Sequence, residues 1–203
     1  MRIGTFIGLL ILFSAAHADT LIDDFSDVQS TTSQSEEMAS GALGMVRFLG
    51  VVISGQQEMS VAGDGTATCR ETVANGFASC RIIYDGVDDD ADMPETNGLS
   101  NVNLISSGET MIPIVVTEFT GTTGQIDVLF HPADPMGDVC DLSTGSYNAP
   151  GTYNLQFTSD PDCVGLNDIG GVRVNISLNG PGSSTTFSML ETTPVTLLQF
   201  DVD

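Results

Sequence analysis

The sequence predicts an all-β fold in which two antiparallel sheets pack as a jelly-roll-like β-sandwich. Polar and apolar residues alternate over short segments along most of the chain, as expected of half-buried strands. Asn-Gly pairs at residues 75–76, 97–98 and 179–180 mark turns between such segments. Long windows with helical periodicity are missing, so the predicted layers are sheet on sheet.

The expected elements follow in chain order. Residues 20–25 predict a first strand, and the Ser-, Thr- and Gln-rich residues 26–40 predict a polar surface loop. Later strands are expected where apolar residues alternate or form short runs between turns. These segments are residues 45–53, 57–62, 66–72, 77–84, 99–105, 112–119, 125–130, 151–157, 172–178, 185–190 and 195–202.

The N-terminal segment has the pattern of a signal peptide. Arg2 precedes an apolar stretch at residues 3–13, and Ala16-His17-Ala18 offers the small-x-small pattern of a cleavage site. The apolar stretch is shorter than the roughly 20 residues that span a bilayer. We therefore expect cleavage after residue 18, one domain at 19–203 and export to the periplasm or beyond. A buried helix is the alternative for this segment. No later segment has transmembrane length, and we expect no anchor at the C-terminus.

Composition excludes several classes of function. The 203 residues include 27 Asp and Glu against 5 Arg and no Lys, which gives a formal net charge of −22. Nucleic-acid binding needs Lys and Arg to displace counterions from phosphates, so a nucleic-acid partner is not expected. An anionic membrane surface would repel the chain, and a lysine-based catalyst is impossible.

The four cysteines fit disulfides formed in an oxidising compartment. Of three possible pairings we expect Cys69–Cys80 and Cys140–Cys163. The first pair flanks a turn signal, so its cysteines are expected to face each other across a hairpin. The second encloses a Gly-, Asp- and Pro-rich excursion. Zinc binding is the alternative, but a C-x2-C pair is missing.

Short motifs in the first half of the expected mature chain resemble a family of exported bacterial β-sandwich proteins, many of which carry a PEP-CTERM sorting tail. The motifs are Leu21-Ile-Asp-Asp-Phe25, Gly44-Met-Val-Arg47, Tyr84-Asp-Gly-Val-Asp88 and Asn97-Gly-Leu99. The chain lacks the sorting tail, and its second half matches only in strand pattern. The resemblance implies a jelly roll similar to galactose-binding-like domains, an architecture that many carbohydrate-binding modules use.

An acidic segment is one candidate Ca²⁺ site. Asp88, Asp90 and Asp92 stand at alternate positions, and Asp85 lies just before them. Carboxylate oxygens at this spacing are ligands that Ca²⁺ prefers. The EF-hand pattern is not completed, because Met93 and Leu99 stand where it needs Gly and Glu. A solvated acidic loop is the alternative.

The two chain ends supply a second candidate Ca²⁺ site. Terminal strands of jelly rolls are often neighbours, so Asp24 in the first expected strand and Asp201 in the last are predicted to approach each other. A cation would relieve the repulsion between their carboxylates. Edge-strand charge that blocks aggregation is the alternative.

These observations leave three functional hypotheses open. The first is an exported, non-catalytic protein with a structural or adhesive role at or outside the cell envelope, where extracellular polysaccharide or surface proteins are its partners. The alternative is a carbohydrate-binding module, with or without Ca²⁺, for which Tyr147 in the loop 143–151 is the best exposed aromatic candidate. For Tyr147 itself, a loop residue packed on the sandwich is the alternative. The third is a secreted hydrolase. It has little support, because no Gly-x-Ser-x-Gly elbow surrounds any Ser and the mature chain has a single His, His131.

Overall fold

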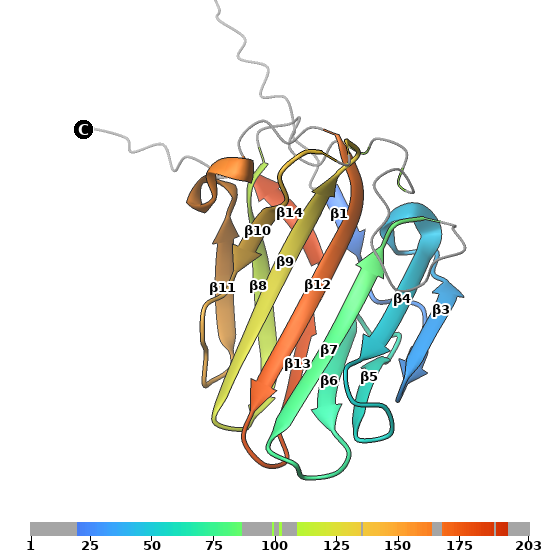
Figure 1. Ribbon diagram of the computed structural model, residues 1–203, viewed down its shortest axis with the longest axis vertical. Helices are drawn as coiled ribbons and strands as arrows, with labels where there is room; N and C mark the ends of the chain where they lie inside the picture. The colour runs from blue at the N-terminus through green and yellow to red at the C-terminus, as the bar shows by residue number, and fades with distance from the viewer. Residues whose placement is uncertain are drawn as a thin grey trace, which may run out of the picture.

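The computed structural model describes residues 20–86, 99, 102, 109–134, 136–163, 168–188 and 190–194. The chain forms the expected all-β sandwich of two antiparallel sheets (Figure 1). Each described helical segment is a three-residue 3-10 turn, so none has the length and apolarity needed to cross a membrane. The strands are β1 (Thr20–Asp23), β2 (Gln29–Thr31), β3 (Gln34–Met38), β4 (Val46–Val51), β5 (Gln57–Val61), β6 (Thr66–Glu71), β7 (Phe77–Tyr84), β8 (Glu109–Thr120), β9 (Thr123–Pro132), β10 (Cys140–Ser143), β11 (Gly151–Gln156), β12 (Ile169–Asn179), β13 (Ser184–Ser188) and β14 (Leu190–Pro194).

The sheet nearer the reader in Figure 1, which we call the front sheet, has the strand order β10-β9-β12-β7-β4-β3. The other, the back sheet, has the order β1-β14-β8-β13-β6-β5-β2, and β11 also pairs with β8. Strand β8 is long enough for β13 and β14 to share one of its edges while β11 takes the other. The two sheets enclose one core.

Strands β9 and β12 are neighbours in the front sheet. In both strands, the alternation of side chains between the two faces decides which of them enter this core. Every second residue points toward the back sheet and is buried and mostly apolar, while the residues between are mostly half-buried. The inward set is Ile126, Val128 and Phe130 from β9 and Val172, Val174, Ile176 and Leu178 from β12. Residues of the back sheet that meet them in the core include Met59, Ile112, Ile114, Val116 and Phe187.

The first strand lies beside a strand from near the C-terminus. β1 pairs antiparallel with β14, and Thr20 stands opposite Thr192. β14 is not the predicted last strand 195–202, so the predicted approach of Asp24 and Asp201 stays a prediction. The segment 195–202, which carries Asp201, lies outside the described residues.

The expected polar loop at residues 26–40 is wrong, because this segment contains β2 and β3. Strand β2 pairs with β5 in the back sheet, and β3 pairs with β4 at an edge of the front sheet. The side chains of β3 are almost all exposed, so its sequence lacks the apolar alternation of a half-buried strand. Strand β10 was also not expected, because it has only four residues. Of the expected strand 99–105, only Leu99 and Val102 are described.

The two predicted disulfides, Cys69–Cys80 and Cys140–Cys163, are confirmed. The predicted hairpin around the first is wrong. Strand β6 belongs to the back sheet and β7 to the front sheet, so this disulfide joins the two layers through the core. The turn between them is a corner at which the chain changes sheet. The second disulfide ties β10 to the 3-10 turn Pro161–Cys163.

Candidate functional site

The outer surface of the front sheet carries half-buried polar side chains from three neighbouring strands. We call this set the polar face: Arg81 from β7, Gln125, Asp127 and His131 from β9, and Arg173 and Asn175 from β12. Each residue alternates with buried residues of the same strand, which explains why the set shares one side of the sheet. Its side chains are held by central strands rather than by loops.

Strand register places these residues next to one another. Asn175 stands between Arg81 and Asp127, its partners on the two adjoining strands. Arg173 stands in the same way between Ile83 and Leu129. Because diagonal neighbours on a sheet are about 7–8 Å apart, long side chains in adjoining rows can reach a common point above the sheet.

Positive groups gather on one part of the polar face. Burial lowers the pKa of Arg173, and the nearby charge of Arg81 lowers it further, while Asp141 opposes this shift. Burial also lowers the pKa of His131, and Arg173 adds to the effect. The imidazole is therefore mainly neutral near pH 7, whereas an arginine side chain stays charged in proteins.

Carboxylates lie on the adjoining part. Gln125 Nε2 donates to both oxygens of Asp127 at 2.9 and 3.1 Å, which fixes the orientation of that carboxylate. Asp141 of β10 lies one strand further out. Partial burial raises the pKa of Asp141, and the negative charges of Asp127 and Asp160 raise it further. The face thus presents acceptors on the β9–β10 side and donors on the β12–β7 side.

Two nitrogen atoms of the polar face have no hydrogen-bond partner in the described part of the chain. They are Arg173 Nε and His131 Nε2, and both are shielded from solvent. Most buried polar atoms in native proteins are hydrogen-bonded. Within the described ranges, these two atoms are exceptions to that rule.

An apolar floor supports the charged groups. Ile83 of β7 faces Phe48 of β4 across the sheet, and both side chains are buried. Gly50 stands opposite Arg81, and a Cβ at this position would lie 3.2 Å from Arg81 Cγ. The missing side chain of Gly50 therefore leaves room for the stem of Arg81 to lie against the sheet.

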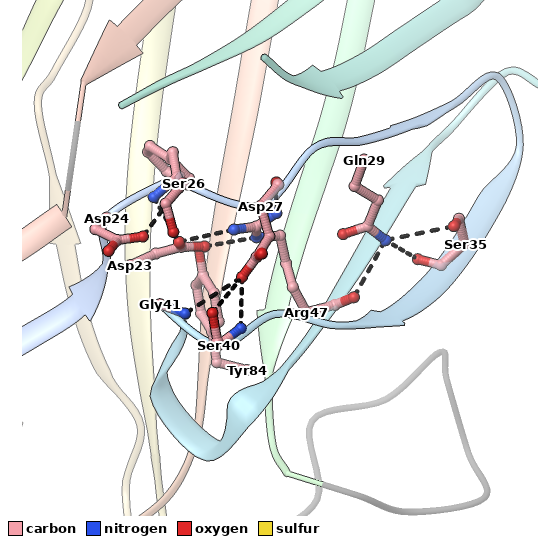
Figure 2. Close-up of polar contacts among 11 residues, drawn as sticks. Asp23, Asp24, Ser26, Asp27, Gln29, Ser35, Ser40, Gly41, Arg47 and Tyr84 are labelled. Atoms are coloured by element: carbon pink, nitrogen blue, oxygen red, sulfur yellow. Dashed lines mark hydrogen bonds and ion pairs between the residues drawn. The ribbon is translucent and has the colours of Figure 1, made fainter. Parts of the chain in front are cut away.

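A second polar cluster lies inside the sandwich, where side chains from β1, β4 and β7 meet (Figure 2). The Arg47 guanidinium donates from Nε to Asp23 Oδ2 at 2.6 Å and from Nη2 to Asp23 Oδ1 at 2.8 Å. Tyr84 Oη donates to Asp23 Oδ2 at 2.8 Å, and the Phe25 amide donates to Oδ1 at 2.8 Å. The Asp23 and Arg47 side chains are both 0% exposed, so this ion pair is fully enclosed.

The partners of this cluster explain the ionisation of its members. Burial raises the pKa of Tyr84 well above its usual value, and the Asp23 charge adds to the shift. Burial alone would lower the pKa of Arg47, but the hydrogen bonds and charge of Asp23 outweigh this effect and raise it. Arg47 Nη1 also donates to the Asp27 carbonyl at 2.9 Å. The cluster holds the N-terminal strand to β4 and β7.

Side-chain bonds of Asp27 extend the cluster to the surface. Asp27 Oδ2 accepts hydrogen bonds from the Ser40 backbone and hydroxyl and from the Gly41 amide (Figure 2). The Ser40 hydroxyl is the main cause of the lowered pKa of Asp27. Asp24 instead accepts from the Ser26 amide at 2.9 Å. The Asp24 bond lies within the turn between β1 and β2, and the Asp27 bonds tie this turn to the segment between β3 and β4.

The structure describes two of the six candidate Ca²⁺ ligands. Asp24 lies beside Ser26 and Gly41, and Asp85 is buried at the end of β7. The other candidates, Asp88, Asp90, Asp92 and Asp201, lie outside the described residues. Among the described residues no group of three or more His, Cys, Asp and Glu side chains is placed to hold a metal. The calcium hypothesis stays a prediction.

The expected exposure of Tyr147 is wrong, because the side chain is only 3% exposed. Its ring packs edge-on against Phe119 and lies 5.1 Å from the ring of Tyr153. Its hydroxyl lies 3.1 Å from Thr185 Oγ1, and burial raises its pKa to about 12. Gly124 makes room for the ring, since a Cβ there would lie 2.5 Å from Tyr147 Cζ. Tyr147 therefore packs the sandwich and offers no open ring face.

Apart from His131, which was considered only as a catalytic residue, the residues of the polar face were not singled out from the sequence. Their one signal was alternation, since each occupies a polar position within or next to the predicted strands 77–84, 125–130 and 172–178. The order of these strands in the sheet is β9-β12-β7, which differs from their order in the chain. Alternation alone could not show that Asn175 stands between Arg81 and Asp127.

Comparison with known proteins identifies no family, because no family model and no curated protein matches the chain. Solved structures do match at low identity. The family 11 carbohydrate-binding module of cellulase Lic26A-Cel5E from Clostridium thermocellum is 10% identical, with a TM-score of 0.43, over 91% of this chain and 99% of that one. PfGH50B is also 10% identical, with a TM-score of 0.44, over 91% of this chain and 24% of that one. TmCBM61, solved with β-1,4-galactotriose, is 7% identical, with a TM-score of 0.34, over 84% of this chain and 90% of that one.

Proposed function

We propose that this protein is an exported, non-catalytic carbohydrate-binding β-sandwich that holds a polysaccharide on its polar face. The observation that carries the proposal is the row Arg81–Asn175–Asp127 across three central strands. A guanidinium, a carboxamide and a carboxylate are thereby presented side by side on a rigid sheet. Two disulfides support a location outside the reducing cytoplasm.

Sugar hydroxyls both donate and accept hydrogen bonds, so they match a face that alternates donors and acceptors. Asp127 accepts, Arg81 donates, and Asn175 between them can do both. Leu129, half-buried in the next row, offers apolar contact for the C–H face of a sugar ring. Because Tyr147 is buried and the chain has no Trp, recognition is proposed to depend on hydrogen bonds rather than on ring stacking.

The structural or adhesive hypothesis fits the same face. A protein that binds envelope polysaccharide through the polar face would thereby be attached to the cell surface. We therefore propose adhesion as a consequence of glycan binding, and catalysis forms no part of the proposal.

Asn175→Ala tests the proposed face in the exported protein with both disulfides formed. Wild type is first screened by affinity electrophoresis against neutral and acidic polysaccharides. For any polymer that binds, Asn175→Ala should weaken the affinity by about tenfold, because two hydrogen bonds to the sugar are lost. Asn154→Ala is the matched control, since Asn154 is exposed on β11 of the back sheet. Equal affinities of the two variants, or no binding by wild type, would contradict the proposal.

A further inference from the structure

Two of the Asn-Gly pairs that mark turns in the sequence lie together at one end of the sandwich, the lower end in Figure 1. Asn75-Gly76 belongs to the corner between β6 and β7, and Asn179-Gly180 lies where β12 ends and the chain turns into β13. The Gly180 amide donates to the Gly76 carbonyl at 2.9 Å, so the two turns touch. The third pair, residues 97–98, lies outside the described residues.

The exposed side chain of Asn75 is held over the peptide that follows it. Asn75 Oδ1 accepts from the Phe77 amide at 3.0 Å, and Asn75 Nδ2 donates to Gln56 Oε1 at 2.9 Å. The first bond closes an Asx turn around Gly76, which bends the carboxamide carbon back toward the Gly76 nitrogen. Reacting atoms that are held near each other react as one molecule and avoid the entropy cost of an encounter.

The Gly76 nitrogen is open to reaction, whereas the Gly180 nitrogen is not. Within the described ranges the Gly76 N–H has no hydrogen-bond partner, and a Cβ at Gly76 would meet no atom within 4 Å. The Gly180 N–H is bound to the Gly76 carbonyl, and a Cβ at Gly180 would lie 2.7 Å from the Thr122 nitrogen. The same dipeptide therefore has an accessible nucleophile in one turn and a blocked, crowded one in the other.

We infer that Asn75 is a site of spontaneous deamidation in the folded protein and that Asn179 is protected from this reaction. The Gly76 nitrogen gives its proton to hydroxide from the solvent and forms a bond to Asn75 Cγ. The Cγ–Nδ2 bond breaks, and the leaving group takes up a proton and departs as ammonia. Water then opens the cyclic imide at one of its carbonyl carbons, which leaves aspartate or isoaspartate at position 75. The sequence of steps needs no oxidant, reductant or enzyme.

Deamidation places a new carboxylate beside that of Glu71. Glu71 Oε1 and Asn75 Oδ1 accept from the same Phe77 amide, at 2.6 and 3.0 Å, so these two oxygens are close together. Burial would raise the pKa of Glu71, but its backbone hydrogen bonds outweigh this effect and lower it, so the group is ionised near pH 7. Like charges in such a position repel each other. The neutral amide of Asn75 therefore fits beside Glu71 better than a carboxylate does.

Glu71 also connects the two turns to each other. Its Oε2 accepts from the Gly182 amide at 2.5 Å and from the Ser183 amide at 3.1 Å, while its Oε1 accepts from Asn75 and Phe77 of the corner. A second carboxylate that pushes Glu71 aside weakens this set of bonds as a whole. Deamidation of Asn75 should therefore loosen the end of the sandwich as the protein ages.

Peptide mapping by mass spectrometry tests the site itself. Wild type with both disulfides formed is incubated at physiological pH and temperature, and isoaspartate is identified by enzymatic methylation. Asn75 should lose its amide about fivefold or more faster than Asn179, because the Gly180 N–H must first leave its hydrogen bond. Reduced protein unfolded in urea is the control, since both Asn-Gly pairs should react there at similar rates. Equal rates in the folded protein, a faster reaction at Asn179, or an intact Asn75 after the unfolded control has reacted would overturn the inference.

Asn75→Asp tests the consequence, because it supplies the carboxylate without the rearranged backbone of isoaspartate. This variant should unfold at a lower urea concentration than wild type. Asn154→Asp is the matched control, since it adds the same charge at an exposed position of β11 and should keep the wild-type midpoint. A midpoint that Asn75→Asp leaves unchanged, or that Asn154→Asp lowers as much, would show that Glu71 does not oppose a carboxylate at position 75.

Discussion

At the scale of single residues, Asp23 is an enclosed carboxylate that accepts four hydrogen bonds. One enclosed carboxylate accepts from the Arg47 guanidinium, the Tyr84 hydroxyl and the Phe25 amide. An enclosed ion pair is not in itself strongly stabilising, because both charges have lost their hydration. Removing one charge, however, leaves the other buried without compensation.

Asp23→Asn should therefore lower the free energy of unfolding by about 3–5 kcal/mol. The amide cannot neutralise Arg47, and its NH2 group faces hydrogen-bond donors that previously met an acceptor. Urea denaturation followed by circular dichroism measures the loss.

Asp24→Asn makes the same chemical change one residue later and is the control. Asp24 is only partly buried, and within the described ranges its side chain accepts one hydrogen bond, from the Ser26 amide, which an asparagine oxygen can still accept. Its effect should stay within about 1 kcal/mol. Equal losses in the two variants would mean that the buried ion pair is not the source of the destabilisation.

The partner of Asp23 could not be predicted from the sequence. For the acids of the first strand the sequence predicts Ca²⁺ between Asp24 and Asp201, and this stays a prediction because Asp201 lies outside the described residues. For Asp23 the structure supplies Arg47, which is brought in by β4. Asp23 and Arg47 are far apart in the chain and meet only because of the way the strands are arranged. Alternation within one strand does not show which other strands lie next to it.

At the scale of elements, strands with apolar alternation were predictable and others were not. The prediction for residues 77–84 coincides with β7, whose buried face is almost continuous. Strand β3 was missed because it lies at an edge, where neither face is buried. The corner between β6 and β7 was predicted as a hairpin because a turn signal is the same whether the chain returns within one sheet or crosses to the other.

The disulfide at this corner should stabilise the packing of the two sheets. Replacing Cys69 and Cys80 together by Ala should lower the free energy of unfolding by about 3 kcal/mol, through greater entropy of the unfolded chain and loss of buried sulfur contacts. Urea denaturation under oxidising conditions measures the change, with the Cys140–Cys163 disulfide left intact. Unchanged stability would show that core contacts alone hold the sheets together.

At the scale of the whole molecule, two sheets were predictable while the proposed binding surface was not. Alternation indicates which side chains face outward, but a surface site also needs the order and register of strands from distant parts of the chain. The polar face combines residues from β7, β9 and β12, and the same pattern gave no reason to prefer it to the outer side of the back sheet. Net charge is no guide to such a surface either, because its sign describes the average surface and not the position of single arginines.

The acid excess makes a separate prediction about stability. With a net charge of −22, repulsion between surface carboxylates is stronger in the compact state than in the expanded unfolded chain. Raising NaCl from about 0.01 M to about 1 M shortens the Debye length from roughly 30 Å to 3 Å. The melting temperature should therefore rise by several degrees across this range, since about 1 kcal/mol corresponds to 2–4 °C in a domain of this size.

Choline chloride at equal ionic strength is the control for this screening effect. Because screening depends on ionic strength rather than on ion identity, it should raise the melting temperature as NaCl does. A melting temperature that stays flat or falls with either salt would show that carboxylate repulsion does not limit stability. A rise produced by millimolar CaCl2 and by neither monovalent salt would also contradict screening. Such a result would instead support a bound Ca²⁺ ion, as predicted for Asp85, Asp88, Asp90 and Asp92. Ca²⁺ is held by several oxygen ligands at one site, and monovalent salts do not replace it there.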